Sequence, residues 1–185
     1  MTLPRGFKAT AEREATRIRH EMGVSEGDPV NILSVAEHVQ AIVVGADRLV
    51  AIERLEELER LQAYAFSAAT FDVKGKSYIV TNPLRSRGRL ASDVAHEIAH
   101  LLLQHDLTEI REIEGVPFRT CRPDEEEQAT VFGGTLLLPR PLLLNAARRG
   151  LGPEQIAVAY GVTTEMARFR YTTTGVAKQV LRRPR

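Results

Sequence analysis

Two histidines that bracket a glutamate restrict the folding of this chain more than any other feature. The segment reads His96-Glu97-Ile98-Ala99-His100. Four residues make about one turn of an α-helix, so a helix here projects both histidines from one face, where they can reach one metal ion. Glu97 then lies roughly 100° round the helix from His96, near such an ion without binding it. The motif therefore predicts a helix with a metal site on one face.

The residues around the motif favour a buried helix. Ser92 or Asp93 can cap its start, and we expect it to run to about Gln104. Its apolar face would consist of Val94, Ile98, Leu101 and Leu102. The alternative is a buried helix whose histidines are satisfied by hydrogen bonds alone, but their spacing around a glutamate favours the metal site.

A catalytic zinc site needs a third protein ligand and an open position for water, whose pKa the ion lowers from about 15.7 toward about 7. His105 is a poor candidate, because nine residues after His96 place it about 180° round a continuing helix. Better candidates are Glu125, Glu126 and Glu127, which begin the next predicted helix and could instead serve its dipole. Glu126 lies on the face of that helix that carries small residues and could approach the motif helix. Helical periodicity turns Glu127 about 100° away from that face, and it does not exclude Glu125 as the ligand.

Elsewhere the pattern predicts a mostly helical chain with little sheet. Residues 64–81 favour a β-hairpin that turns at Lys74-Gly75-Lys76, and the apolar run 41–44 could add a strand. A polar connection is expected between the two site helices. Further helices are expected at residues 11–22, after Asp28-Pro29 with Asp28 as the cap, at residues 47–62 and from 123 to before Pro139. The region from 141 onward should be helical with breaks near Gly150, Gly161 and Gly175. We therefore expect an α+β fold.

The formal net charge of +1 conceals two differently charged parts. Residues 1–139 carry sixteen Lys or Arg and twenty-two Asp or Glu, whereas residues 140–185 carry nine and two. We expect a metal-bearing core at 1–139 and a basic helical region at 140–185, packed together as one compact unit. Residues 156–169 resemble a helix-turn-helix, which would allow DNA binding, but packed helices that complete the core are the favoured interpretation.

The sequence also restricts the compartment. Cys121 is the one cysteine in 185 residues, so an internal disulfide is excluded. No apolar run reaches the roughly 18 residues needed to span a bilayer, and the N-terminal residues lack the apolar core of a secretory signal. We expect a cytoplasmic protein without a membrane partner.

Two segments resemble the paired signatures of the ImmA/IrrE family of metallopeptidases. The first is residues 96–100, and the second reads Glu126-Glu127-Gln128-Ala129-Thr130-Val131-Phe132-Gly133-Gly134-Thr135-Leu136-Leu137-Leu138-Pro139. The family's second signature resembles E-x-x-A-N-x-F-A-x-x-L-L-M-P, with its leading glutamate as third zinc ligand. The resemblance therefore implies a zincin-like domain of the gluzincin type, with the hairpin beside the motif helix. It also implies one zinc ion held by His96, His100 and Glu126, with Glu97 as the catalytic residue.

The second signature departs from the family pattern. Thr130 stands where asparagine is usual, the pair Gly133-Gly134 stands where the pattern has alanine followed by any residue, and Leu138 replaces methionine. Each glycine costs a helix about 0.5–1 kcal/mol relative to alanine. Close packing of the two helices would explain the glycines, and a looser helix is the alternative.

The resemblance implies a zinc-dependent endopeptidase that acts on a cytoplasmic protein. Glu97 would take a proton from water and deliver it to the leaving amine, while an extended substrate pairs with a strand of the 64–81 hairpin. Family members cleave or inactivate helix-turn-helix repressors, which implies a separate repressor as the substrate. The alternatives are DNA binding or sequestration of a repressor without hydrolysis. Candidates for the group that stabilises the oxyanion are Tyr64, Tyr78, Tyr160, Tyr171 and His105.

Overall fold

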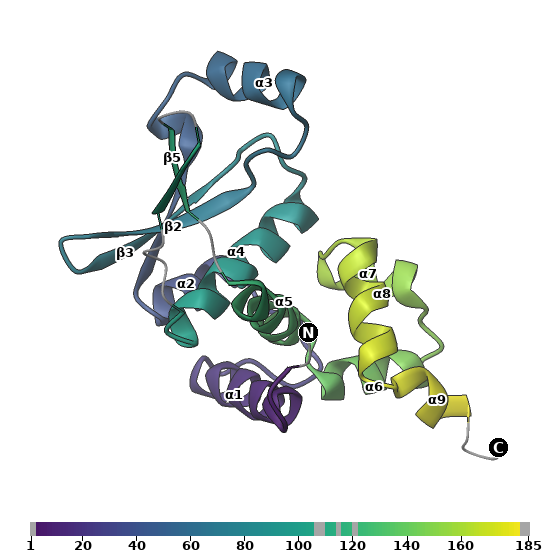
Figure 1. Cartoon of the computed structure of the whole chain (residues 1–185). Helices are drawn as coiled ribbons and strands as arrows, with labels where there is room; N and C mark the ends of the chain where they lie inside the picture. The colour runs from purple at the N-terminus through teal and green to yellow at the C-terminus, as the bar shows by residue number, and fades with distance from the viewer. Residues whose placement is uncertain (1–2, 106–109, 114–115, 120–121, 182–185) are drawn as a thin grey trace.

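A three-stranded sheet lies beside the helix that carries the histidine pair (Figure 1). The computed structural model describes residues 3–105, 110–113, 116–119 and 122–181. Strand β3 (Lys76–Thr81) is central, parallel to β1 (Ala41–Gly45) and antiparallel to β2 (Ala68–Val73). The sheet is thus mixed rather than purely antiparallel, and β2 lies at its edge.

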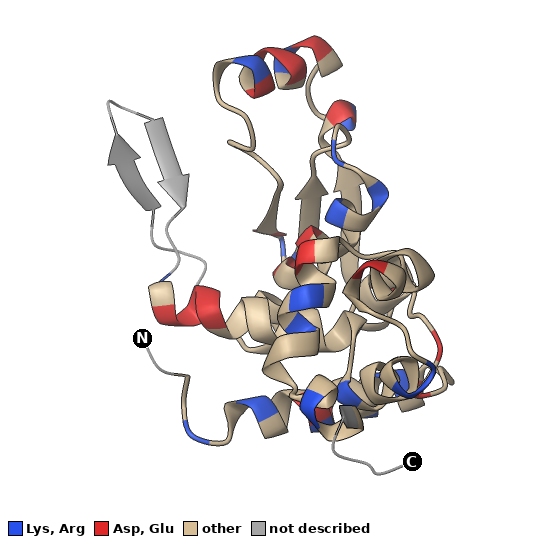
Figure 2. Ribbon diagram, turned by 90° about the vertical axis from the view of Figure 1, so that its right-hand side faces the viewer, with Lys and Arg blue, Asp and Glu red and all other residues tan. Residues whose placement is uncertain are grey.

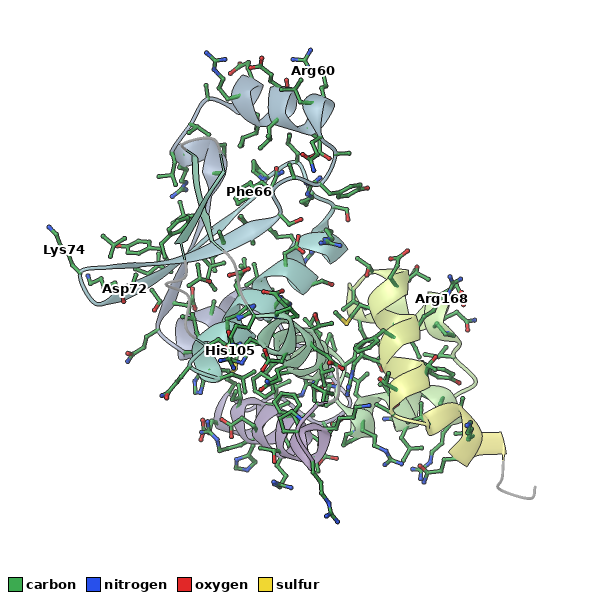
Figure 3. The ribbon with its side chains drawn as sticks, viewed as in Figure 1. Arg60, Phe66, Asp72, Lys74, His105 and Arg168 are labelled. Carbon is green, nitrogen blue, oxygen red and sulfur yellow. The ribbon has the colours of Figure 1, made fainter. Side chains whose placement is uncertain are left out.

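Strands β2 and β3 form the expected hairpin. Lys74 and Gly75 connect them with φ values of 55° and 75°, the left-handed pair that suits a two-residue turn. The Asp72 side chain accepts a hydrogen bond from the Gly75 amide at 3.1 Å. Figure 3 shows Lys74 at the tip of the hairpin, away from the helices. In the register that this turn sets, Thr70 pairs with Ile79.

The motif helix, α4 (Arg87–Leu102), begins earlier than the sequence suggested. Ser86 caps it, because its hydroxyl accepts a hydrogen bond from the Arg89 amide. The expected caps, Ser92 and Asp93, lie inside the helix, and Asp93 forms an ion pair with Arg89 one turn back. Ser86 and Ser92 are both good cap residues, so composition alone could not choose between them.

Helix α5 (Pro123–Leu137) packs closely along α4, which is the first of the two explanations offered for the glycines of the second signature. Proline occupies its first turn, and the helix ends before Pro139. A Cβ atom on Gly133 would lie 2.7 Å from the Ala95 carbonyl oxygen and 3.0 Å from the His96 amide nitrogen. Those contacts are shorter than real Cβ atoms show, so the helices approach at a distance that only glycine permits.

The remaining elements surround these two helices. Helix α1 (Phe7–Glu21) packs against α5. Helix α2 (Ile32–His38) is capped by Asn31 rather than by the expected Asp28, and the expected helix at 47–62 divides into η1 (Ala46–Arg48) and α3 (Ile52–Leu61). Where a polar connection was expected, β4 (Ile110–Ile113) pairs antiparallel with β5 (Val116–Arg119).

The C-terminal region is helical, and its breaks fall at the expected glycines. It contains α6 (Arg140–Arg148), α7 (Pro153–Tyr160), α8 (Thr164–Thr173) and α9 (Val176–Leu181). Arg170 of α8 is buried, donates to the Leu138 carbonyl oxygen at 3.1 Å and lies 2.6 Å from a Glu12 carboxylate oxygen. This arginine fastens α8 to α1 and to the end of α5. The division into parts at 1–139 and 140–185 stays a prediction.

The core is continuous from α1 to the C-terminal helices, and the mostly helical α+β fold is confirmed. Its largest fully buried side chains include Ile18, Ile79, Ile98, Phe132, Leu136, Leu138, Leu142 and Ile156. Within the described ranges, no helix has the length and apolar character required to cross a membrane.

We expect the substitution Gly133→Ala to destabilise the protein by about 1–3 kcal/mol, because the added methyl group meets fixed backbone of α4. Gly134→Ala is the matched control, since its Cβ meets the Met166 sulfur at 2.8 Å and side-chain carbons of Arg170. Side chains can adjust more readily than backbone, so this loss should be smaller. Urea unfolding measures both, and a Gly133→Ala variant as stable as the wild type would contradict the close approach.

Candidate metal centre

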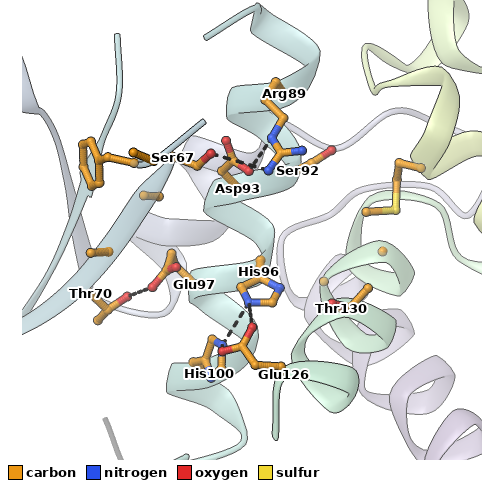
Figure 4. A pocket seen from close by; sticks show the side chains of 17 residues that line it. Ser67, Thr70, Arg89, Ser92, Asp93, His96, Glu97, His100, Glu126 and Thr130 are labelled. Atoms are coloured by element: carbon orange, nitrogen blue, oxygen red, sulfur yellow. Dashed lines mark hydrogen bonds and ion pairs between the residues drawn. The ribbon is translucent and has the colours of Figure 1, made fainter. Parts of the chain in front are cut away.

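His96 and His100 project from one face of α4 into a cavity of about 720 Å³ (Figure 4). One wall is the edge strand β2 with the segment before it, and the others belong to α4, to α5 and, at Met166, to α8. Glu126, from the first turn of α5, enters the same cavity. The helical spacing of the motif and the close packing of α5 on α4 thus bring the three side chains together.

The ligand atoms of these three residues converge. The Nε2 atoms of His96 and His100 are 3.0 Å apart, and Glu126 places one carboxylate oxygen 3.1 Å from His96 Nε2 and the other 3.4 Å from His100 Nε2. One ligand atom from each residue can be chosen so that all lie within 4.8 Å of one another. This is a group that could hold one metal ion.

The donor set fits zinc. Bonds of about 2.0–2.2 Å at tetrahedral angles place neighbouring ligand atoms about 3.3–3.6 Å apart. The two Nε2 atoms are 3.0 Å apart, and Glu126 brings one oxygen within 3.1 Å of His96 and its other oxygen within 3.4 Å of His100. Two imidazoles and one carboxylate are a known catalytic zinc set. His100 is 2% exposed, whereas His96 and Glu126 are partly exposed, so the group is anchored on one side and open to the cavity on the other.

The other two candidate glutamates point elsewhere. Glu125 is buried, with one carboxylate oxygen 3.4 Å from the Arg122 side chain, and its other oxygen has no hydrogen-bond partner among the described residues. Glu127 lines a second hollow of about 400 Å³, together with Lys8 and Phe169. The placement therefore favours Glu126 as the third ligand, a choice that helical periodicity left open.

Glu97 lies in the cavity next to this group and is held by a residue from the sheet. The hydroxyl of Thr70 donates a hydrogen bond of 2.6 Å to Glu97 Oε2. Thr70 is 2% exposed and belongs to β2. The sequence offered no signal for this contact, because it depends on how β2 packs across α4.

A second polar pair continues the same face of α4 toward its N-terminus. Arg89 Nε lies 2.8 Å from Asp93 Oδ1, and the Ser67 hydroxyl accepts a long hydrogen bond of 3.5 Å from the same arginine. Burial raises the pKa of the Asp93 carboxyl above its usual value, while the charge of Arg89 opposes that shift. Both side chains line the cavity. The sequence did not indicate this pair, because Asp93 was expected to cap the helix and Arg89 therefore to precede it.

His105 lies close to the site after all, although not among the group that could hold the metal. The helix ends at Leu102, so His105 lies just beyond the helix end and the 180° offset of a continuing helix does not apply to it. Its Nδ1 atom is 2.9 Å from Nδ1 of His100. Burial lowers the pKa of the His105 ring, and the neighbouring His100 adds to that effect.

The tyrosines proposed for oxyanion stabilisation, which are Tyr64, Tyr78, Tyr160 and Tyr171, are not among the described residues that line the cavity. The ring of Tyr64 instead packs beneath the Arg85 guanidinium, and Arg85 Cζ lies 4.7 Å from the centroid of the ring. Arg85 in turn forms an ion pair with Glu59, at 2.8 Å.

Comparison with known proteins identifies one family. The family model described as the IrrE N-terminal-like domain, Peptidase_M78, matches residues 56–172, which is more than half of the chain. The match includes both signature segments, the edge strand and α8 up to its penultimate residue. Comparisons with curated proteins and with solved structures gave no match.

Removal of the Glu126 carboxylate should weaken Zn²⁺ binding more than removal of its neighbour. We expect Glu126→Gln to lower the affinity by more than the roughly 10–100-fold typical of a residue that only supports a ligand. Glu125→Gln, the matched control, should bind Zn²⁺ as the wild type does. Competition with a chromogenic chelator measures both, and loss of binding in Glu125→Gln with retention in Glu126→Gln would exchange the two assignments.

Proposed function

The chain belongs to the family of the IrrE N-terminal-like domain, Peptidase_M78, and on that premise we propose that it is a zinc-dependent metallo-endopeptidase. Membership supports a metallopeptidase type of function. The observation that carries the finer proposal is the convergence of His96, His100 and Glu126 beside Glu97, in one cavity bordered by an edge strand.

The proposed chemistry divides between an ion and the residues around it. A zinc ion held by His96, His100 and Glu126 would supply a Lewis acid that polarises the scissile carbonyl and acidifies water. Glu97 accepts a proton from the attacking water and delivers it to the nitrogen of the leaving amine. Thr70 holds one oxygen of that carboxylate by a hydrogen bond, which keeps the other oxygen available for the proton.

Strand β2 supports a mode of substrate binding. It lies at the edge of the sheet, and Ala68, Ala69 and Thr70 line the cavity. An extended peptide can add to such an edge by backbone hydrogen bonds. The small side chains of the two alanines leave room between the strand and α4, so the peptide bond can approach the proposed zinc site. An extended segment of a protein is therefore the proposed substrate.

The proposed substrate is a separate cytoplasmic protein, a helix-turn-helix repressor. This follows from the family resemblance of the two signatures, whose members act on such repressors. Sequestration of the repressor without hydrolysis is the competing proposal, and it would need the same contacts but no proton transfer. Analysis of the repressor after incubation distinguishes the two, because only hydrolysis creates new chain termini.

DNA binding by the basic C-terminal helices is not the favoured proposal. Several of their arginines are engaged within the protein: Arg170 is buried against Glu12, and Arg168 lies 2.6 Å from a Glu154 carboxylate oxygen. Glu165 is exposed on α8, where it would repel a phosphate backbone. Figure 2 shows acidic residues gathered at the start of α5, next to the part of the chain drawn in grey. These contacts favour a role for α7 and α8 in completing the core.

Glu97→Gln should abolish cleavage while Zn²⁺ binding persists. The amide cannot accept the proton from water, and loss of a general base typically costs about 10²–10⁴-fold in rate. Purified protein is incubated with helix-turn-helix repressors encoded in the same genome, and mass spectrometry detects new termini. Cleavage by the variant at the wild-type rate would refute the mechanism. Absence of new termini with the wild type, despite a stable complex, would favour sequestration.

Thr70→Val should lower kcat by about 10-fold or more, because a hydrogen bond to a charged group contributes about 1.5–3 kcal/mol. Valine has nearly the shape of threonine but no hydroxyl, and Thr70→Ser restores the donor as the matched control. Both variants should bind Zn²⁺ normally, since Thr70 contacts Glu97 and not the proposed ligands. Equal kcat values for the valine and serine variants would show that the hydroxyl does not position Glu97.

A further inference from the structure

The end of α4 turns the chain back onto one of the proposed ligands. The His105 amide donates a hydrogen bond to the His100 carbonyl oxygen at 3.1 Å, and the Gln104 amide donates to the Leu101 carbonyl oxygen at 3.2 Å. These two bonds form a Schellman motif, in which the chain reverses direction at a residue with left-handed backbone angles. Gln104 supplies it with a φ of 54°, although it is not glycine. The backbone of His105 is therefore tied to His100 itself.

The two imidazole rings meet at the same place. Their Nδ1 atoms are 2.9 Å apart, and their planes cross at 72°. His100 is 2% exposed, so its Nδ1 has little access to water. Two ring nitrogens at hydrogen-bond distance need one proton between them. Each ring must then carry a defined tautomer. Figure 3 shows His105 at this end of α4, next to α5.

The proposed zinc site decides the direction of that hydrogen bond. The Nε2 atom of His100 faces His96 and Glu126, and a metal ligand must offer an unprotonated nitrogen. The neutral His100 ring then carries its proton on Nδ1 and donates it to His105 Nδ1. His105 in turn keeps its own proton on Nε2, which leaves that nitrogen as a donor.

A partner for the far side of His105 lies on α5. The side chain of Gln128 hydrogen-bonds the His105 ring, and its amide oxygen can accept from Nε2. Gln128 is two residues beyond Glu126 on the same helix. The hydrogen bonds thus run from His100 through His105 to Gln128, and they join the two helices that carry the proposed ligands.

We propose that His105 is a positioning residue, which fixes the tautomer and the ring orientation of His100 so that Nε2 offers its lone pair to the metal. The inference rests on the proposed function, since it presumes that His100 binds zinc. Metal-bound histidines commonly donate their second nitrogen to such a partner, and loss of the partner lowers metal affinity about 10–100-fold.

Three variants separate the hydrogen bond from the packing of the ring. His105→Phe keeps a planar ring without an acceptor, and it should lower Zn²⁺ affinity about 10–100-fold in chelator competition. His105→Asn places an amide oxygen near the position of Nδ1 and should restore most of the affinity. Gln104→Gly keeps the left-handed turn and should bind Zn²⁺ as the wild type does. Nitrogen NMR of the zinc-loaded wild type should show the His100 proton on Nδ1.

The outcomes distinguish this assignment from the proposed function. Wild-type affinity in His105→Phe, or equal losses in the Phe and Asn variants with intact folds by circular dichroism, would overturn the role of His105 alone. A His100 proton on Nε2 in the zinc-loaded protein would overturn it as well. A wild-type protein that binds no Zn²⁺ would overturn the proposed function and this assignment together.

Discussion

The close approach of α4 and α5 is the constraint on which the rest of the site depends. At Gly133 the two helices are separated by less than a methyl group would require, because a Cβ atom there would meet the backbone of Ala95 and His96. This approach places the first turn of α5 beside the histidines of α4, so Glu126 reaches both. A wider spacing would leave the carboxylate too far from one of them. Gly133, which departs from the family signature and lowers helix propensity, is thus explained by the close packing of the two helices.

Local periodicity was sufficient to predict the part of the site that lies on one helix. The pairing of His96 with His100 follows from 3.6 residues per turn, and so does the offset of Glu97. The choice among the glutamates of α5 was not local, because it depends on how two helices cross. Glu126 was therefore reached through the family signature, and Thr70 was not foreseen.

The differences between the sequence-based predictions and the structure also arise from contacts between distant parts of the chain or from unusual backbone conformations. Ser86 and Ser92 both suit a helix start, and the structure begins the helix after Ser86, whose hydroxyl accepts a hydrogen bond from the Arg89 amide. Periodicity places His105 on the far side of a continuing helix, whereas the chain turns back at Gln104, which adopts a backbone conformation that its residue type rarely takes. Fold class was easier to predict, since hairpin residues, helix caps and glycine breaks act within a few positions. The net charge likewise gave no indication that an arginine such as Arg170 is buried in the protein and paired with a glutamate.

The turn at the tip of the hairpin has a consequence far from where it lies. Neighbouring side chains of a strand point to opposite faces of a sheet, so a slip of β2 by one position against β3 would turn Thr70 away from Glu97. Ala69 or Phe71 would then face the carboxylate, and neither can donate a hydrogen bond from its side chain. The two left-handed residues at Lys74 and Gly75 help to prevent that slip. An exposed loop at the end of the hairpin thereby helps to keep the proposed proton carrier aligned.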